Sequence, residues 1–126
     1  MTKLESLLKQ YERAVDRLRD VLNREKNEFM RDSAIQRFEF TFELCWKAVK
    51  AYLEERYGVR CASPKSCFRD AFAQGVFDYS DFWLEMCNLR NLTAHIYDER
   101  EAEKIYACLP EALAHFEILL SALKKT

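Results

Sequence analysis

The scarcity of residues that make turns is the strongest constraint on this fold. The chain has two glycines and two prolines in 126 residues. Folds built from many short strands need frequent tight turns, and glycine and proline supply the backbone angles of those turns. So few of them favour a small number of long helices joined by short loops. With 49% apolar and 33% charged residues, the composition is typical of a globular protein with a packed core.

Apolar residues recur at the three- and four-residue spacing of an α-helix along most of the chain. This spacing predicts a first helix over residues 3–23, and the polar stretch NREKNEFMRD that follows predicts a loop. Asp32 or Ser33 would cap a second helix, and Gly58 would end it. The apolar face of this second helix consists of Ile35, Phe38, Phe42, Cys45, Trp46, Val49 and Leu53.

Two helices are predicted in the middle of the chain. Ser63 followed by Pro64 is a cap with proline at the first helical position, which predicts a short third helix ending at Gly75. Its inner face would consist of Cys67, Phe68, Ala71 and Phe72. Asp78 or Ser80 would cap a fourth helix. The apolar residues of that helix are Phe82, Trp83, Met86, Leu89 and Ile96.

The last predicted helix starts near Asp98, with Glu101 in an arrangement like a capping box. Its apolar residues are Ile105, Leu109, Leu113, Phe116, Leu120 and Leu123. Pro110 lies inside this helix, and we expect a kink rather than an end there because the helical spacing of apolar residues continues past the proline. The sequence therefore predicts an all-α fold, an up-and-down four-helix bundle with an additional short helix, in one domain over residues 1–126.

Charge and cysteine usage exclude several classes of protein. The formal net charge is −1, so any RNA-binding role must use a local cluster of charge rather than a basic surface. The five cysteines are Cys45, Cys61, Cys67, Cys87 and Cys108. An odd number without a CxxC pair favours free thiols and no zinc site. The acidic, amphipathic N-terminus is not a signal peptide, and no run approaches the roughly 18 apolar residues of a membrane span. We therefore expect a cytoplasmic protein.

A dense polar run, RNLTAHIYDE, contains one of the chain's two histidines. On a regular helix Arg90 and His95 would lie about 140° apart, so one helix could not easily aim both at one atom. His95 would share a face with Asn91, and Arg90 with Tyr97. Two such helices meeting across a two-fold axis would bring arginine and histidine from both chains into one cleft.

Such a cleft suits the cleavage of RNA. Histidine moves protons near neutral pH, and arginine holds a phosphate through two donors. A base would activate the 2′-hydroxyl while a cation stabilises the charge on phosphorus, with Asn91 or Tyr97 orienting either group and no metal or cofactor required. The alternative interpretation is that the polar run is only the solvated end of a helix.

The run RNLTAHIYDE resembles the Arg-x4-His-x-Tyr motif of the HEPN superfamily. Residues 32–55, residues 63–75 and the helix that carries Trp83 are similar, in order and spacing, to the nucleotidyltransferase substrate-binding protein family. The resemblance covers about the middle two-thirds of the chain. It implies a HEPN-like helical bundle.

The resemblance also implies roles for single residues. Arg90 and His95 fall on the family's catalytic or RNA-contacting pair, and Asn91 on the polar position after the arginine. Tyr97 falls on the tyrosine that a partner enzyme can modify. Family members form homodimers that bind a minimal nucleotidyltransferase (MNT). In the toxin–antitoxin interpretation the HEPN protein is a metal-independent ribonuclease, and the MNT silences it by transferring AMP to that tyrosine.

For the other residues that could be functional, we expect structural roles. The aromatic residues lie at helical spacing, which indicates a core rather than a base-stacking platform. His115 is expected to be structural or exposed. Glu39 and Glu43 are expected to lie on a solvated face with nearby lysines, the alternative being a pair of catalytic or metal-binding acids. Lys65 and Arg69 are weaker candidates for phosphate contacts.

Three classes of function remain open from the sequence. The first is a regulated ribonuclease that uses Arg90 and His95. The second is a non-catalytic subunit that binds a substrate for a neighbouring nucleotidyltransferase. The third is a dimeric interaction module whose motif anchors the partner. A homodimer is expected in all three.

Overall fold

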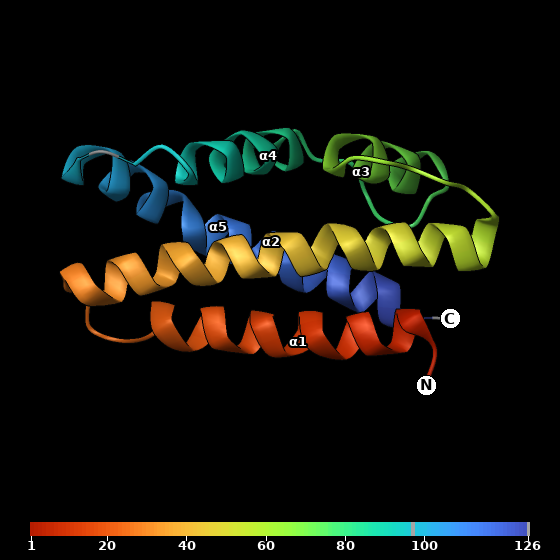
Figure 1. Cartoon of the computed structure of the whole chain (residues 1–126), viewed down its shortest axis with the longest axis horizontal. Helices are drawn as coiled ribbons and strands as arrows, with labels where there is room; N and C mark the ends of the chain where they lie inside the picture. Colours follow the sequence, from red (N-terminus) through yellow and green to blue (C-terminus); the bar gives the residue numbers. More distant parts are fainter. Residues whose placement is uncertain (97, 126) are drawn as a thin grey trace.

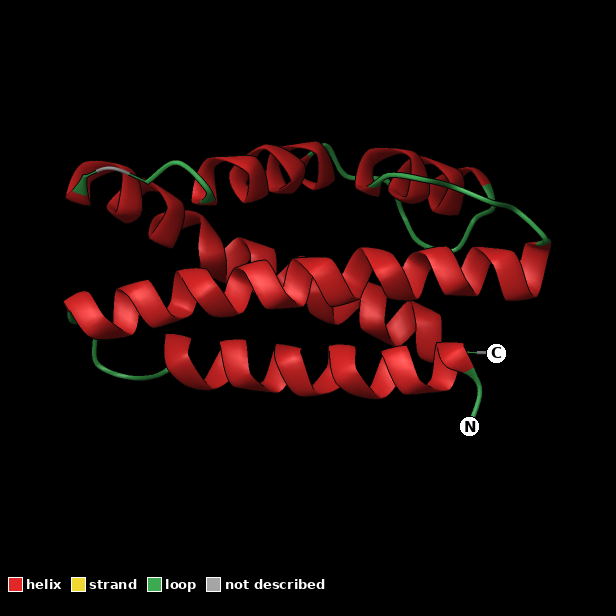
Figure 2. Cartoon of the chain, viewed as in Figure 1, coloured by secondary structure: helices red, strands yellow, loops and turns green. Residues whose placement is uncertain are grey.

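The computed structural model describes residues 1–96 and 98–125, and helices make up most of this part of the chain. The five helices are α1 (Lys3–Leu22), α2 (Glu28–Tyr57), α3 (Pro64–Ala73), α4 (Phe82–Thr93) and α5 (Glu99–Lys124). No strand occurs among the residues described (Figure 2). The predicted all-helical bundle is therefore confirmed.

Three long helices and a row of two short ones form the bundle. In Figure 1, α1 lies along one side of α2, and α3 and α4 follow one another along the opposite side. Helix α2 packs against all four other helices. The fourth position of the bundle is thus shared by α3 and α4, rather than filled by one main helix with a short helix beside it.

The centre of the core is aromatic. Phe116 of α5 packs against Tyr11 of α1, Phe38 of α2 and Trp83 of α4, with ring centroids 6.0–6.3 Å apart. The Tyr11 hydroxyl donates a hydrogen bond of 2.6 Å to the Phe116 carbonyl. The core assignment of the aromatic residues holds for most of them, but Phe72 is 45% exposed.

The start of α2 differs from the prediction. The helix begins at Glu28, because the Asn27 side chain accepts a hydrogen bond of 2.8 Å from the Met30 amide. The second half of the stretch predicted as a loop, residues 28–32, is therefore helical. Its Arg31 is buried and ion-paired with Glu103 of α5 at 3.2 Å. A polar residue on the inner face interrupts the apolar stripe on which the prediction rested.

The remaining helix ends agree better with the sequence. Gly58 ends α2 with a φ of 65°, where a side chain would strain the backbone. Ser63 caps α3 in a capping box with Ser66. The prediction that Asp78 or Ser80 caps α4 is wrong: the N-cap residue is Asp81, whose side chain makes no capping hydrogen bond, although the Ser80 hydroxyl accepts from the Phe82 amide at 3.2 Å. Helix α5 runs through Pro110 without a break.

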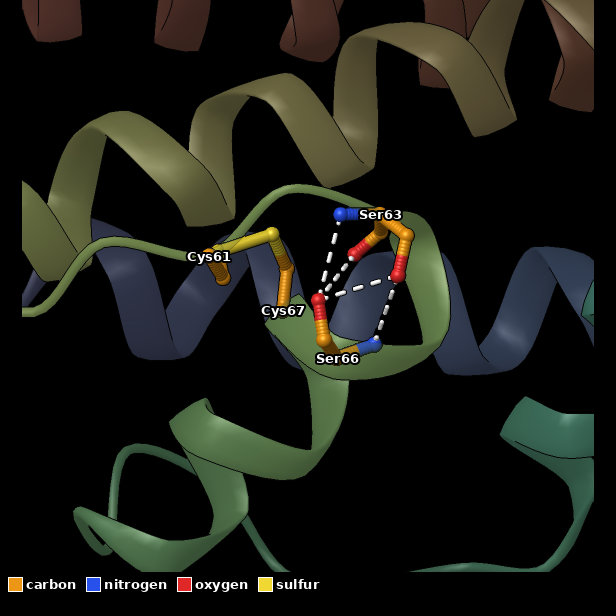
Figure 3. Close-up of a disulfide and its surroundings, with 4 residues drawn as sticks. All are labelled: Cys61, Ser63, Ser66 and Cys67. Carbon is orange, nitrogen blue, oxygen red and sulfur yellow. Dashed lines mark hydrogen bonds between the residues drawn. A yellow bond between two sulfur atoms is a disulfide. The ribbon is translucent and has the colours of Figure 1, made fainter.

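Two cysteines are paired, contrary to the prediction of free thiols. Cys61 in the loop after α2 and Cys67 in α3 form a disulfide (Figure 3). The turn capped by Ser63 folds the chain back, so that the two Cα atoms lie 5.2 Å apart. Cys45, Cys87 and Cys108 are free, and the first two of these are buried.

Helix α5 is long and apolar enough to cross a membrane, by length and composition alone. From the sequence we expected no membrane-spanning segment. In this structure its apolar residues serve the core, because α5 packs against α1, α2 and α4 and contributes eight buried residues to it. Of its most apolar 18-residue stretch, 33% is buried inside the bundle.

Candidate functional site

An arginine held by a glutamate from another helix is the centre of the site. Arg90 lies in the last turn of α4, and its Nη2 donates to Glu43 Oε1 on α2. Glu43 also accepts a hydrogen bond of 3.2 Å from the Trp46 indole nitrogen. Two contacts thus fix the carboxylate, which in turn orients the guanidinium. A guanidinium has five N–H donors, so one held in this way keeps donors for a phosphate.

Arg90 and Asn91 lie at the edge of a small hollow between α2, α3 and α4. The hollow has a volume of about 280 Å³, and Ser63, Lys65 and Cys87 contribute to its walls. Lys65 is exposed at the first turn of α3. Two cations and an amide therefore face one space, an arrangement that suits a phosphate or another anion.

His95 lies outside α4. The helix ends at Thr93, whose hydroxyl donates a hydrogen bond of 2.6 Å back to the Arg90 carbonyl. The His95 amide donates to the Leu92 carbonyl at 2.9 Å in the turn that follows, and the residue is exposed. The expectation that one helix carries Arg90 and His95 about 140° apart is therefore wrong, as is the shared helical face of His95 and Asn91.

The hollow and the histidine are not one closed site in a single chain. Arg90 and Asn91 line the hollow, whereas His95 is not among its lining residues. Tyr97, the predicted modification site, lies outside the described residues. The next described residue, Asp98, caps α5 by accepting a hydrogen bond of 2.9 Å from the Glu101 amide.

A second carboxylate lies near Arg90. Glu39 is one turn before Glu43 on α2, and partial burial raises the pKa of its carboxyl while the positive charge of Arg90 opposes that rise. A carboxyl with a raised pKa binds its proton more tightly in the folded protein than in the unfolded chain. Stability therefore falls as the pH rises from the unfolded pKa through the folded one.

We expect Glu39→Gln to stabilise the protein at pH 7 and to have less effect at pH 4, where the native carboxyl is largely protonated. The gain should be modest, within about 0.5 kcal/mol, because the side chain is only partly buried. Thermal unfolding of both proteins between the two pH values measures it. A variant less stable than the wild type at pH 7 would mean that attraction to Arg90 outweighs the desolvation of the carboxylate.

The other reactive groups have structural partners. His115 hydrogen-bonds the Ser80 hydroxyl at 3.1 Å and stacks on Phe82 with ring centroids 4.7 Å apart, which supports its structural assignment. Cys87 borders the hollow, but burial raises the pKa of its thiol, so it is a poor nucleophile. Within the described ranges, no group of three or more His, Cys, Asp or Glu is placed to bind a metal ion.

Sequence reasoning missed the role of Glu43. We expected a solvated face there, yet Glu43 is the partner of Arg90, 47 residues away in the chain. The only local signal is Trp46, one turn further along, because a partly buried indole N–H needs an acceptor. Lys65 was only a weak candidate, and the structure places it beside Arg90 and Asn91.

The fold and the site define a helical bundle with an ion-paired arginine at the edge of a small hollow, which Lys65 and Asn91 also line. The family described as "nucleotidyltransferase substrate binding protein like" matches residues 6–125. The chain belongs to this family, which is the one that the sequence resembles.

One relative in sequence is the probable ribonuclease HepT of Haemophilus influenzae. It is 31% identical over 101 residues, which cover 73% of this chain and 66% of the relative. The chain thus matches just under two thirds of that protein's length.

Three solved structures are similar. A protein of Thermus thermophilus has a TM-score of 0.86 at 38% identity, over 91% of this chain and 99% of that one. A Haemophilus influenzae protein described as a substrate binding domain of a nucleotidyltransferase has a TM-score of 0.71 at 25% identity, over 97% of both chains. A tri-AMPylated HEPN toxin of Shewanella oneidensis, in complex with MNT antitoxin, has a TM-score of 0.79 at 18% identity over the whole of both chains. This last likeness shows the fold alone.

Proposed function

We propose that this chain is a metal-independent endoribonuclease, working in a two-protein module with a minimal nucleotidyltransferase. The observation that carries the proposal is the fixed Arg90, which shares a hollow of about 280 Å³ with Asn91 and Lys65. His95 follows in the next turn of chain. The name of the Haemophilus influenzae relative, a probable ribonuclease, supports the same activity.

The reaction would be an attack within the RNA strand. His95 takes the proton of a 2′-hydroxyl, whose oxygen attacks the neighbouring phosphorus. Arg90 stabilises the negative charge that develops on the phosphate oxygens, and Asn91 orients the phosphate. The 5′-oxygen leaves as its bond to phosphorus breaks and takes a proton from water, so that one product ends in a 2′,3′-cyclic phosphate and the other in a 5′-hydroxyl.

The proposal includes a homodimer. Because His95 lies outside the hollow of its own chain, the His95 of a second chain is a candidate to face that hollow. Leu84 and Leu92, which are 43% and 55% exposed, lie on the outer side of α4. Exposed leucines beside the motif support a contact between two chains there.

Control by the nucleotidyltransferase is proposed at Tyr97. An AMP group transferred to its hydroxyl would add bulk and negative charge two residues from His95, and would repel the phosphate of RNA. The state of the Shewanella oneidensis toxin, AMPylated and bound to its MNT antitoxin, supports this form of control. The cytoplasm remains the proposed location.

A second function is favoured by the family's description and by the Haemophilus influenzae substrate binding domain. In that case the hollow of about 280 Å³ would hold part of a substrate for the nucleotidyltransferase, without any reaction at His95. The third candidate, a module that only anchors the partner, predicts neither RNA cleavage nor ligand binding.

The test compares purified wild type with His95→Ala on single-stranded RNA in the presence of EDTA. We expect cleavage by the wild type, with cyclic phosphate ends, and a loss of about 10²–10⁴-fold in the variant. Both proteins must have the same oligomeric state and melting temperature. An inert wild type, or equal cleavage by both proteins, would overturn the proposal. Incubation with the nucleotidyltransferase and ATP should silence the wild type but not Tyr97→Phe.

A further inference from the structure

A basic groove lies between α1 and α2, on a different side of α2 from the hollow. Arg13 and Arg17 of α1 form one wall, and Arg37, Phe40 and Leu44 of α2 form the other. Its volume is about 250 Å³. Among the described residues no carboxylate lines it. Three positive charges therefore gather here on a chain whose formal net charge is −1.

The arginines of the groove differ in how they are held. Arg37 donates through Nη1 to the Arg17 carbonyl at 2.8 Å, with Asp20 3.9 Å away, so it is fixed across the seam between the helices. Arg13 and Arg17 are exposed and form no ion pair within the part of the chain that the structure describes. Their charges are available to an anion outside the protein.

An aromatic ring accompanies these charges. Phe40 is 56% exposed, whereas its neighbours Phe38 and Phe42 on α2 are buried; Phe29, at the start of the same helix, is also exposed. An exposed ring beside unpaired guanidinium groups combines the two contacts that single-stranded nucleic acid uses, which are stacking of a base and pairing with a phosphate. Phe40, Leu44 and Ala14 supply the apolar part of the groove. RNA is favoured over a protein partner because the unpaired charges of Arg13 and Arg17 lie beside the ring and suit phosphates.

The groove is close to the candidate site. Phe40 and Glu43 are three residues apart on α2, so their Cβ atoms are neighbours, about 5–6 Å apart on the helix surface. Phe40 belongs to the groove, and Glu43 holds Arg90. A strand that passes over this ridge of α2 can therefore touch both places.

We propose that the α1–α2 groove binds single-stranded RNA flanking the bond to be cut, with Arg13, Arg17 and Arg37 on phosphates and Phe40 stacked on a base. This inference rests on the proposed ribonuclease function, and it adds an RNA-binding surface outside the Arg90 and His95 motif. It also explains how a chain without net positive charge holds a polyanion, because binding depends on local charge.

The experiment measures binding without cleavage. A labelled single-stranded RNA of about 12 nucleotides, within the length that such grooves span, is titrated with the His95→Ala protein at about 50 to 200 mM salt. The variants Arg13→Gln/Arg17→Gln, Arg13→Lys/Arg17→Lys and Phe40→Ala are made in the same background. The control is Arg24→Gln/Arg60→Gln, which removes two exposed arginines that do not line the groove.

We expect the double glutamine variant to lower the slope of log affinity against log salt by about 1.4, for two lost phosphate contacts. The double lysine variant and the control should keep the slope, and Phe40→Ala should weaken binding about 5- to 100-fold. An unchanged slope in the glutamine variant would overturn the inference. So would RNA binding that stays intact while binding of the nucleotidyltransferase is lost, because the groove would then be a protein interface.

The same samples separate this inference from the proposed function. Each groove variant is also made with His95 intact and assayed for cleavage. Cleavage by the wild type with unaltered RNA binding in the variants would refute the groove alone. Salt-dependent binding that the variants lose, without cleavage by the wild type, would support the groove and refute the ribonuclease.

Discussion

Replacing Arg90 by alanine is expected to lower kcat/KM for RNA cleavage by about 10²–10³-fold, the usual effect of removing one donor to a developing negative charge. The fold should tolerate the change. Arg90 and Glu43 are 42% and 32% exposed as side chains, and an ion pair with this much exposure contributes about 0–1 kcal/mol to stability. Cleavage rates test the expected loss of activity, and melting temperatures test whether the fold tolerates the change.

Two further variants refine the prediction. Arg90→Lys keeps the charge but loses the planar pair of donors, so its activity should lie between those of the wild type and Arg90→Ala. Glu43→Gln keeps an acceptor of similar shape but removes the charge that orients Arg90, so it should lower kcat/KM less than Arg90→Ala does. If Glu43→Gln cleaves as fast as the wild type, the ion pair does not position Arg90.

Mixing Arg90→Ala with His95→Ala tests whether one active site is built from residues of two chains. In a dimer of Arg90→Ala with His95→Ala, one of the two composite sites keeps both its arginine and its histidine. After random exchange of chains, about a quarter of the wild-type activity should return. If no activity returns although mixed dimers form, the two residues act within one chain, and the proposed composite cleft is wrong.

Local patterns predicted the fold well. The helical spacing of apolar residues located α1 and α5 to within one residue at most of their ends, and Gly58 and Ser63 marked real boundaries. These features depend on neighbours in the chain, which the sequence displays directly. The start of α2 was missed because Arg31 is buried by an ion pair with Glu103, 72 residues away. No pattern among residues close in the chain predicts a partner so far away.

For the same reason, the sequence predicted only part of the candidate site. The motif and the family resemblance pointed to Arg90, Asn91 and His95. The group that holds Arg90 was not predictable, because Glu43 comes from another helix. The helix was expected to continue to Ile96, yet it ends at Thr93, whose hydroxyl bonds back to the Arg90 carbonyl. That end places His95 in a turn, so neither the expected separation of about 140° from Arg90 nor the helical face expected to be shared with Asn91 applies.

Replacing Phe116 by alanine is expected to lower the free energy of unfolding by about 3–5 kcal/mol. This side chain is fully buried, and it joins four helices through its contacts with Tyr11, Phe38 and Trp83. The Phe116 carbonyl would still accept from the Tyr11 hydroxyl, so the loss is that of apolar packing and of the cavity left behind. Since domains of this size are commonly stable by only about 5–15 kcal/mol, the variant should be close to unfolding.

Denaturant unfolding measures the loss, and Ile118→Ala is the matched control. Ile118 lies on the same helix two residues away but is 61% exposed, so its truncation should change stability by no more than about 0.5 kcal/mol. Phe116→Leu, which refills part of the cavity, should fall between Phe116→Ala and the wild type. A cost below about 1.5 kcal/mol for Phe116→Ala, well under the range for such truncations, would mean that the four helices close over the gap. The aromatic centre would then not be what holds α4, and with it Arg90, against α2.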